Sequence, residues 1–206
     1  MALIHQATVV PSKLTLLTAW LPSRPWFTSA PDLKSLGSYR FDDPAGEVGI
    51  ETLLLQAGDG PVFQVPLTYR AAPRVRAEEF LVGTTEHSVL GTRWVYDGCG
   101  DPVWATALAT AVLTGGTQAA ELVDRDGQLE ARLPTATVSG SGTAGTPVGA
   151  IGMVSCRDEG PTTVVRSDLL ELIVVRVIGT EIQAAQTLTG NWAGGGPAVL
   201  AGVRPI

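Results

Sequence analysis

Two apolar segments separated by a glycine-rich turn set the strongest limit on how this chain can fold. Residues 47–56 and 62–69 favour β-strands, and Gly58-Asp59-Gly60 lies between them. Glycine adopts the positive φ angles that tight connections between antiparallel strands require. The sequence therefore predicts an antiparallel hairpin at this position. Pro66 lies inside the second segment and removes one backbone N–H, so we expect an edge strand or a bulge there.

Two helices are expected to pack on this sheet. Ser12 can cap a first helix over residues 13–21, which ends before Pro22 because proline lacks the N–H that a helix interior needs. A second helix begins at Asp101-Pro102, since aspartate suits the N-cap and proline suits the first helical position. Gly115-Gly116 then ends it.

The C-terminal part of the chain has a different composition. Residues 139–149 are rich in Gly, Ser and Thr, which is typical of a flexible connector. This glycine-rich segment lacks the lysine that a phosphate-binding loop needs. We expect strands in the segments that favour β-structure, namely residues 151–156, 162–166, 169–178 and 198–203.

Composition narrows the class of protein. A hydrophobic fraction of 45% and a charged fraction of 17% over 206 residues are typical of a folded protein with a buried core. The net charge of −6 and the lack of a basic stripe argue against a nucleic-acid partner. Cys99 and Cys156 are far apart and lack paired spacing, so we expect two reduced thiols rather than a disulfide or a zinc site.

The N-terminal residues and the apolar segments indicate the cellular location of the protein. Met1 to Gln6 contains no basic stretch and no long apolar run, so we expect no signal peptide. Residues 105–113 and 169–178 are too short to cross a bilayer. The expected location is therefore the cytoplasm, with no membrane partner.

Three sequence blocks resemble the N-terminal cap domain of maltokinases, which phosphorylate maltose with ATP. They are Trp20 to Phe27, Val65-Pro66-Leu67, and Tyr96-Asp97 through Asp101-Pro102. The resemblance covers residues 15–116 and implies an α+β fold in which a curved antiparallel sheet is packed by two or three helices. We expect a cap-like domain over residues 1–133. Residues 134–206 would then form a smaller β-rich segment that resembles a truncated kinase N-lobe.

The residues of phosphoryl transfer are not recognisable in this sequence. In the family, a polar phosphate loop and a strand lysine follow the cap; here residues 157–163 and Leu172 lie near those places. The lysines are Lys13 and Lys34, both close to the N-terminus, and no His-x-Asp or Asp-Phe-Gly-like motif follows. Phosphoryl transfer needs a cation on the phosphates and acidic ligands for magnesium. We therefore expect the chain to stop short of a catalytic lobe, with no kinase activity, cofactor or metal.

A small group of polar side chains suggests a binding site. His87 follows Glu86 and could act in acid–base chemistry, although a hydrogen bond at an interface or one that anchors a loop is the simpler explanation. Arg93 and Asp97 could bind a ligand, or they could form a buried Arg–Asp bridge beside the helix cap Asp101. A hydrolase or transferase built on Glu86, His87 and Asp97 lacks converging motifs.

Tryptophans supply the remaining candidates. Trp20 and Trp26 follow the first helix around Pro22, where core packing and a sugar-stacking platform are both possible interpretations. The leading hypothesis is a non-catalytic accessory protein that contacts an enzyme of α-glucan, trehalose or maltose metabolism. The alternative is a carbohydrate or small-molecule binding module. Its exposed tryptophans would come from Trp26, Trp94, Trp104 and Trp192.

Overall fold

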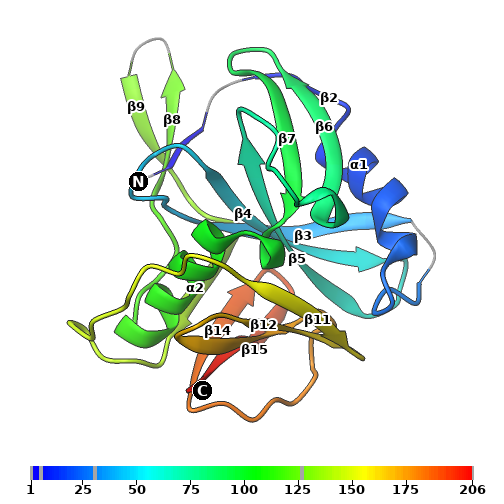
Figure 1. The fold of residues 1–206 in the computed structure, drawn as a ribbon. Helices are drawn as coiled ribbons and strands as arrows, with labels where there is room; N and C mark the ends of the chain where they lie inside the picture. The colour runs from blue at the N-terminus through cyan, green and yellow to red at the C-terminus, as the bar shows by residue number, and fades with distance from the viewer. Residues whose placement is uncertain (1, 5–6, 30–31, 126–127, 206) are drawn as a thin grey trace.

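A computed structural model describes residues 2–4, 7–29, 32–125 and 128–205 of the chain. Within these ranges the protein is mostly antiparallel sheet, one part of which curls into a half-barrel, and it has two α-helices (Figure 1). Three short 3₁₀ helices also occur in the described part: η1 (Leu21–Ser23), η2 (Glu78–Phe80) and η3 (Gly98–Gly100).

A six-stranded antiparallel sheet carries the N-terminal half of the fold, and we call it the N-terminal sheet. The predicted hairpin forms its centre as β4 and β5, joined through a turn at residues 58–60. Its strands, in spatial order, are β2 (Val9–Val10), β6 (Leu81–His87), β7 (Gly91–Asp97), β5 (Val62–Arg70), β4 (Gly49–Ala57) and β3 (Leu33–Phe41).

A second six-stranded antiparallel sheet, the C-terminal sheet, is built entirely from later residues. Its spatial order is β10 (Ala136–Gly140), β14 (Gln186–Trp192), β15 (Gly195–Pro205), β13 (Leu170–Val175), β12 (Thr162–Arg166) and β11 (Ser155–Glu159). A small third sheet pairs β1 (Ala2–Ile4) in parallel with β8 (Glu121–Arg125), and β8 in antiparallel with β9 (Gln128–Arg132).

Both helices begin and end where local chemistry favours it. In α1 (Lys13–Trp20) the Ser12 hydroxyl accepts the Thr15 backbone N–H at 3.1 Å. In α2 (Pro102–Thr114) the Asp101 carboxylate accepts the Val103 N–H at 3.0 Å. Gly115 ends α2 at a φ of 68°, in the left-handed region that favours glycine.

The two faces of the N-terminal sheet bury different cores. On one face Leu17 and Trp20 of α1 pack on apolar side chains of the central strands, among them Leu53, Leu55, Phe63 and Val65. On the other face α2 and the C-terminal sheet enclose a second cluster, which includes Tyr39, Leu54, Trp104, Leu108, Leu172 and Leu200. This second cluster therefore draws on both sides of the expected boundary at residue 134.

The expectation that Pro66 marks an edge strand or a bulge is wrong. The strand β5 lies between β7 and β4, and Pro66 is in register with Thr52 without a bulge. The pairing of β5 with β7 starts only at Leu67, while the Gln64 N–H donates to the Arg176 carbonyl at 2.9 Å. Pro66 therefore lies between the part of β5 that bonds to the segment at Arg176 and the part that pairs with β7. At this point its missing N–H costs no hydrogen bond of the sheet.

The expectation of a flexible connector over residues 139–149 is also wrong for its first half. Residues 139 and 140 belong to β10, and the Gly142 and Thr143 N–H groups donate to the carbonyls of Val112 and Leu113 in α2. A Cβ atom at Gly142 would lie 2.0 Å from the Leu113 oxygen. Glycine here permits close backbone contact with the end of α2, which is a packing role rather than a source of flexibility.

Candidate functional site

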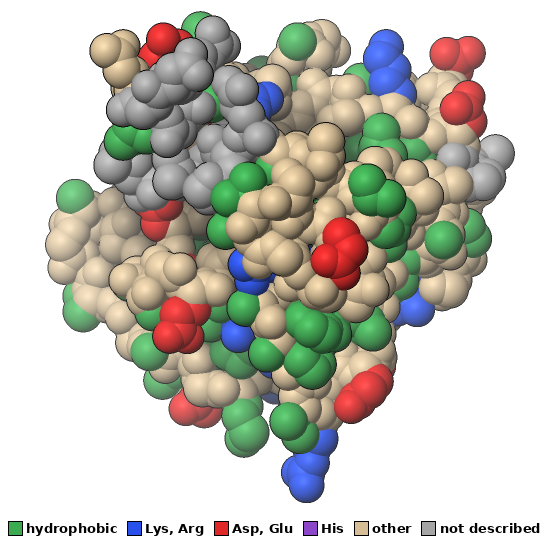
Figure 2. Space-filling view, turned by 90° about the horizontal axis from the view of Figure 1, so that it is seen from above, with side chains coloured by type: hydrophobic (Ala, Val, Ile, Leu, Met, Phe, Trp, Pro, Cys, Tyr) green, Lys and Arg blue, Asp and Glu red, His purple; other side chains and the backbone are tan. Residues whose placement is uncertain are grey.

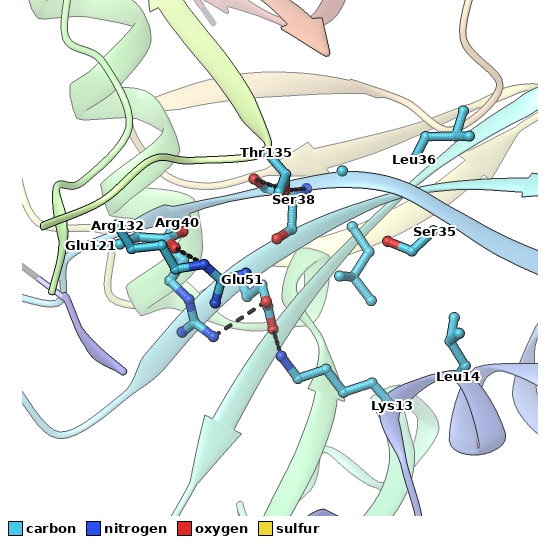
Figure 3. Close-up of a pocket in the computed structure, with 12 residues that line it drawn as sticks. Lys13, Leu14, Ser35, Leu36, Ser38, Arg40, Glu51, Glu121, Arg132 and Thr135 are labelled. Carbon is cyan, nitrogen blue, oxygen red and sulfur yellow. Dashed lines mark hydrogen bonds and ion pairs between the residues drawn. The ribbon is translucent and has the colours of Figure 1, made fainter. Parts of the chain in front are cut away.

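A buried carboxylate lies at the centre of the most polar region of the N-terminal sheet. The strand register places Glu51 of β4 opposite Arg40 of β3, and both side chains lie on the face that α1 covers. The side chain of Lys13, the first residue of α1, extends to the same carboxylate (Figure 3). Glu51 accepts from Lys13 Nζ at 2.5 Å and from the Tyr69 hydroxyl at 2.9 Å, and Arg40 Nη2 lies 3.2 Å from its other oxygen.

The surrounding charges keep Glu51 ionised. Burial by itself would raise the pKa of this carboxyl, because charge is poorly solvated inside a protein. The positive charges of Arg40 and Lys13, with hydrogen bonds from Lys13 and Tyr69, instead lower its pKa to about 2. The pKa of the Tyr69 hydroxyl is raised, by burial first and then by the Glu51 charge. Glu51 is therefore a fixed anion that orients two cations, and it is unsuited to act as a general base near neutral pH.

Two cavities adjoin this cluster and share Lys13 and Arg40 in their walls. The smaller, of about 380 Å³, lies between α1, β3 and the small third sheet, with Glu51 at its base (Figure 3). The larger, of about 590 Å³, lies on the other side and extends along the 42–50 segment toward β6 and β7. Cavities of this size can hold small metabolites.

The larger cavity collects two of the residues that the sequence singles out. His87 and Arg93 both line it. The His87 Nδ1 accepts the backbone N–H groups of Val89 at 3.2 Å and Leu90 at 3.1 Å, so the imidazole anchors the β6–β7 turn. Glu86 is exposed and accepts from the Thr92 hydroxyl at 2.7 Å. Glu86 does not line the two cavities, and neighbours along a strand point to opposite faces.

Asp97 is part of the core. Its carboxylate accepts from Arg176 Nη2 at 2.6 Å, and the exposed fractions of these side chains are 7% and 1%. Arg176 also donates from Nε to the Thr163 hydroxyl at 2.8 Å and stacks over the Trp26 ring at 4.8 Å. The Asp97 partner is thus an arginine 79 positions away, whereas Arg93 donates to the Leu90 carbonyl at 2.6 Å. The expected bridge exists, with a different arginine.

Asp101 forms a second buried bridge, again without Arg93. Arg70 donates to both of its oxygens at 2.8 Å, and the Thr68 hydroxyl donates at 3.0 Å. Burial would raise the pKa of Asp101, but the hydrogen bonds and charge of Arg70 hold it below the usual value. A single carboxylate thus caps α2 and ties it to β5. Pro102, as the sequence pattern predicts, is the first residue of α2.

The prediction that four exposed tryptophans form a sugar-binding site is wrong for two of them. Trp26 and Trp104 are each 2% exposed, so neither ring offers a face to a sugar. Trp20 is also buried and meets Trp26 edge to face with ring centroids 6.2 Å apart, next to Pro22 in η1. Core packing is therefore the correct interpretation of this aromatic group. Trp94 and Trp192 are half-buried.

Sequence reasoning missed the Lys13–Arg40–Glu51–Tyr69 cluster altogether. One signal was present: Glu51 is the only charged residue between Gly49 and Gln56, in a strand that is otherwise suited to a core. Its partners come from separate elements, and no local pattern connects them. In the described part of the chain, no group of three or more His, Cys, Asp or Glu side chains is placed to hold a metal ion.

The fold and the site together define an α+β protein with a curled antiparallel sheet, one face of which is covered by a helix and lined by a charged cluster. Residues 20–101 match the family model of the maltokinase N-terminal cap domain, and this match begins at the end of α1 and runs to the cap of α2. The chain is thus maltokinase N-terminal cap-like in this segment. No curated protein matches it. Among the described residues, no helix is both long and apolar enough to span a membrane.

Proposed function

We propose that this chain is a non-catalytic accessory protein of the cytoplasm that contacts an enzyme of α-glucan, trehalose or maltose metabolism. The match of residues 20–101 to the maltokinase cap domain carries the proposal, because it links the N-terminal sheet to proteins that act on maltose. In that family the cap lies against a kinase lobe, so a cap-like sheet is suited to protein contact.

The environment of Leu172 supports a non-catalytic role. The resemblance to maltokinases puts Leu172 near the place of the nucleotide-binding lysine, and the Leu172 side chain is completely buried in the core cluster. The same resemblance puts residues 157–163 near the phosphate loop, and in the structure they belong to the β11–β12 hairpin with a turn at Gly160. A phosphate needs donors aimed at it from a loop or helix start, which this paired hairpin lacks.

The C-terminal sheet supports the comparison with a kinase N-lobe. It is antiparallel, and it joins the cap-like sheet through backbone hydrogen bonds from Gln64 and Ile178 to Arg176 and Val62. The Gln64 side chain donates to the carbonyls of Val175 at 3.0 Å and Leu200 at 2.8 Å. We therefore propose that residues 134–206 are a reduced N-lobe fixed against the cap.

One surface is suited to protein contact. Val10, Val89 and Leu90 are 67%, 57% and 44% exposed, and they lie along the β2–β6 edge and the β6–β7 turn. Figure 2 shows the molecule from above the view of Figure 1, with hydrophobic side chains exposed at several places on this face between acidic and basic ones. Exposed apolar side chains that lie close together are typical of protein interfaces.

Two measurements test the proposal. The purified chain, incubated with ATP and maltose, should release no ADP above a blank; maltose-dependent ADP formation would show that it is an enzyme. Affinity capture from the native extract should recover a glucan, trehalose or maltose enzyme with the wild type and not with the Val89→Asp/Leu90→Asp variant. Val75→Asp, at another site that is 88% exposed, is the matched control and should capture normally.

Carbohydrate binding remains the second candidate, supported by the two half-buried rings of Trp94 and Trp192. Titration of tryptophan fluorescence with maltose, trehalose and soluble glycogen tests it. A saturable change that Trp94→Phe or Trp192→Phe removes would favour a binding module. A flat response to all three sugars would eliminate it.

A further inference from the structure

The smaller cavity has a surplus of positive charge in a protein whose net charge is −6. Its walls carry Lys13, Arg40 and Arg132 against two carboxylates, Glu51 and Glu121. Each carboxylate already has a cation beside it, since Arg132 Nε lies 3.8 Å from Glu121 and Lys13 Nζ lies 2.5 Å from Glu51. The three cations outnumber the two carboxylates by one, and Arg40 shares Glu51 with Lys13, so the cavity walls keep one net positive charge that a ligand can neutralise.

Hydrogen-bond donors also exceed acceptors at the base of this cavity. Both Glu51 oxygens are engaged, one by Lys13 and Tyr69 and the other by Arg40. A guanidinium carries five N–H groups and an ammonium three. Within the described residues, Arg40 makes one side-chain ion pair and Lys13 makes one, so several N–H groups of the two cations can donate to a ligand.

The rest of the lining indicates the size and polarity of that ligand. Ser35 and Ser38 place hydroxyl groups on the β3 wall, and Leu14, Leu36 and Leu53 supply apolar surface (Figure 3). A volume of about 380 Å³ suits a small metabolite rather than a polymer segment. The cavity thus combines an anion-binding base with walls that can contact hydroxyl and CH groups.

We propose that this cavity binds a small metabolite that carries a phosphate group, with Lys13 and Arg40 as the phosphate-binding residues. Phosphate accepts several charge-assisted hydrogen bonds at once, and arginine and lysine are the side chains that bind it most often. Glu51 holds both cations at the base of the cavity and so limits the entropy lost on binding. The site is independent of the proposed protein contact, which lies on the β2–β6 edge and the β6–β7 turn.

Isothermal titration calorimetry of the full chain tests this site with four probes. Inorganic phosphate and glycerol 3-phosphate should bind, and their affinity should fall as salt is raised because the attraction is electrostatic. Glycerol should not bind, and malonate should bind more weakly than phosphate. Absence of phosphate binding at low ionic strength, or a preference for malonate over phosphate, would overturn the proposal.

Matched variants locate the binding. Lys13→Gln should weaken glycerol 3-phosphate binding roughly tenfold or more, the usual value of a hydrogen bond to a charged group. Lys34→Gln is the control, because Lys34 is exposed and lies outside the cavities, and its affinity should not change.

A second variant covers the possibility that Lys13→Gln fails to fold. Ser35 is exposed, and Ser35→Glu places a negative charge on the cavity wall without removing a structural contact that the structure shows. It should abolish phosphate binding, whereas Ser155→Glu, on the exposed edge strand β11, should bind as the wild type does. Unchanged binding by Ser35→Glu, with folding verified by circular dichroism, would refute the site.

Discussion

At the scale of single residues, Asp97 and Arg176 form the most deeply buried ion pair in the described part of the chain. Both side chains are buried, and the guanidinium also contacts Thr163 and Trp26. Removing one member leaves the other charge buried without compensation, which costs about 3–5 kcal/mol. We expect Asp97→Asn to lower the free energy of unfolding by this order, measured by urea denaturation. Glu159→Gln is the control: its ion pair with Arg157 is exposed and should contribute less than about 1 kcal/mol.

A double variant distinguishes a charge effect from a packing effect at the same pair. Asp97→Leu combined with Arg176→Met removes both charges and keeps apolar volume, so it should cost less than the sum of the two single variants. A purely additive result would mean that the two side chains do not interact, contrary to their distance of 2.6 Å.

The low pKa of Glu51 should make the stability of the folded protein depend on pH. Its pKa is about 2 in the folded protein, below the usual value of 4.5 for a glutamate. A carboxyl with a depressed folded-state pKa contributes stability above its unfolded pKa and loses it as pH falls toward the folded value. We expect the wild type to lose stability between about pH 5 and pH 2, and Glu51→Gln to show a shallower decrease over that window. Glu47→Gln, at an exposed position, should follow the wild-type profile, and a profile unchanged in Glu51→Gln would contradict the assigned pKa.

At the scale of elements, the contact between the glycine-rich segment and the end of α2 makes a sharp prediction. A side chain at Gly142 would collide with the Leu113 carbonyl, because the two backbones pack directly on each other. Gly142→Ala should therefore destabilise the protein by roughly 1–3 kcal/mol, as overpacking does. Thermal unfolding should show a lower Tm, and hydrogen exchange at residues 140–143 should accelerate. Gly152→Ala, where a Cβ meets nothing within 4 Å, should leave both unchanged.

Sequence patterns predicted those elements whose causes are local. Ser12 and Asp101 start their helices, and Gly115 ends α2, because caps act within one turn of the backbone. The central hairpin follows from its own turn, and residues 162–166 form β12 with the expected bounds. Sequence patterns failed where contacts with a distant segment determine the local conformation. Pro66 in β5 and the glycines after residue 139 are such cases, because their partners lie elsewhere in the chain.

The candidate site was beyond sequence reasoning for the same reason. Lys13, Arg40 and Glu51 come from a helix and two strands, and only the β3–β4 register and the position of α1 bring them together. The residues predicted from the sequence were reactive, charged or aromatic side chains that lie close together along the chain. Of these, His87 and Arg93 line the larger cavity, and Asp97 and Trp26 pack inside the core.

At the scale of the whole molecule, we expect the chain to unfold as one unit in spite of the expected division at residue 134. The N-terminal and C-terminal sheets share one hydrophobic cluster, and Gln64 and Arg176 link them through buried hydrogen bonds. Neither sheet can open without exposing that cluster and unpairing these groups, so the two should unfold together. In the Trp192→Phe variant the remaining four tryptophans all lie before residue 134, and their fluorescence reports on the N-terminal part and on the face where Trp26 and Trp104 meet the C-terminal part. Its urea midpoint should coincide with that from far-ultraviolet circular dichroism, which reports on both sheets. Separate midpoints would instead show that residues 1–133 and 134–206 are independent domains.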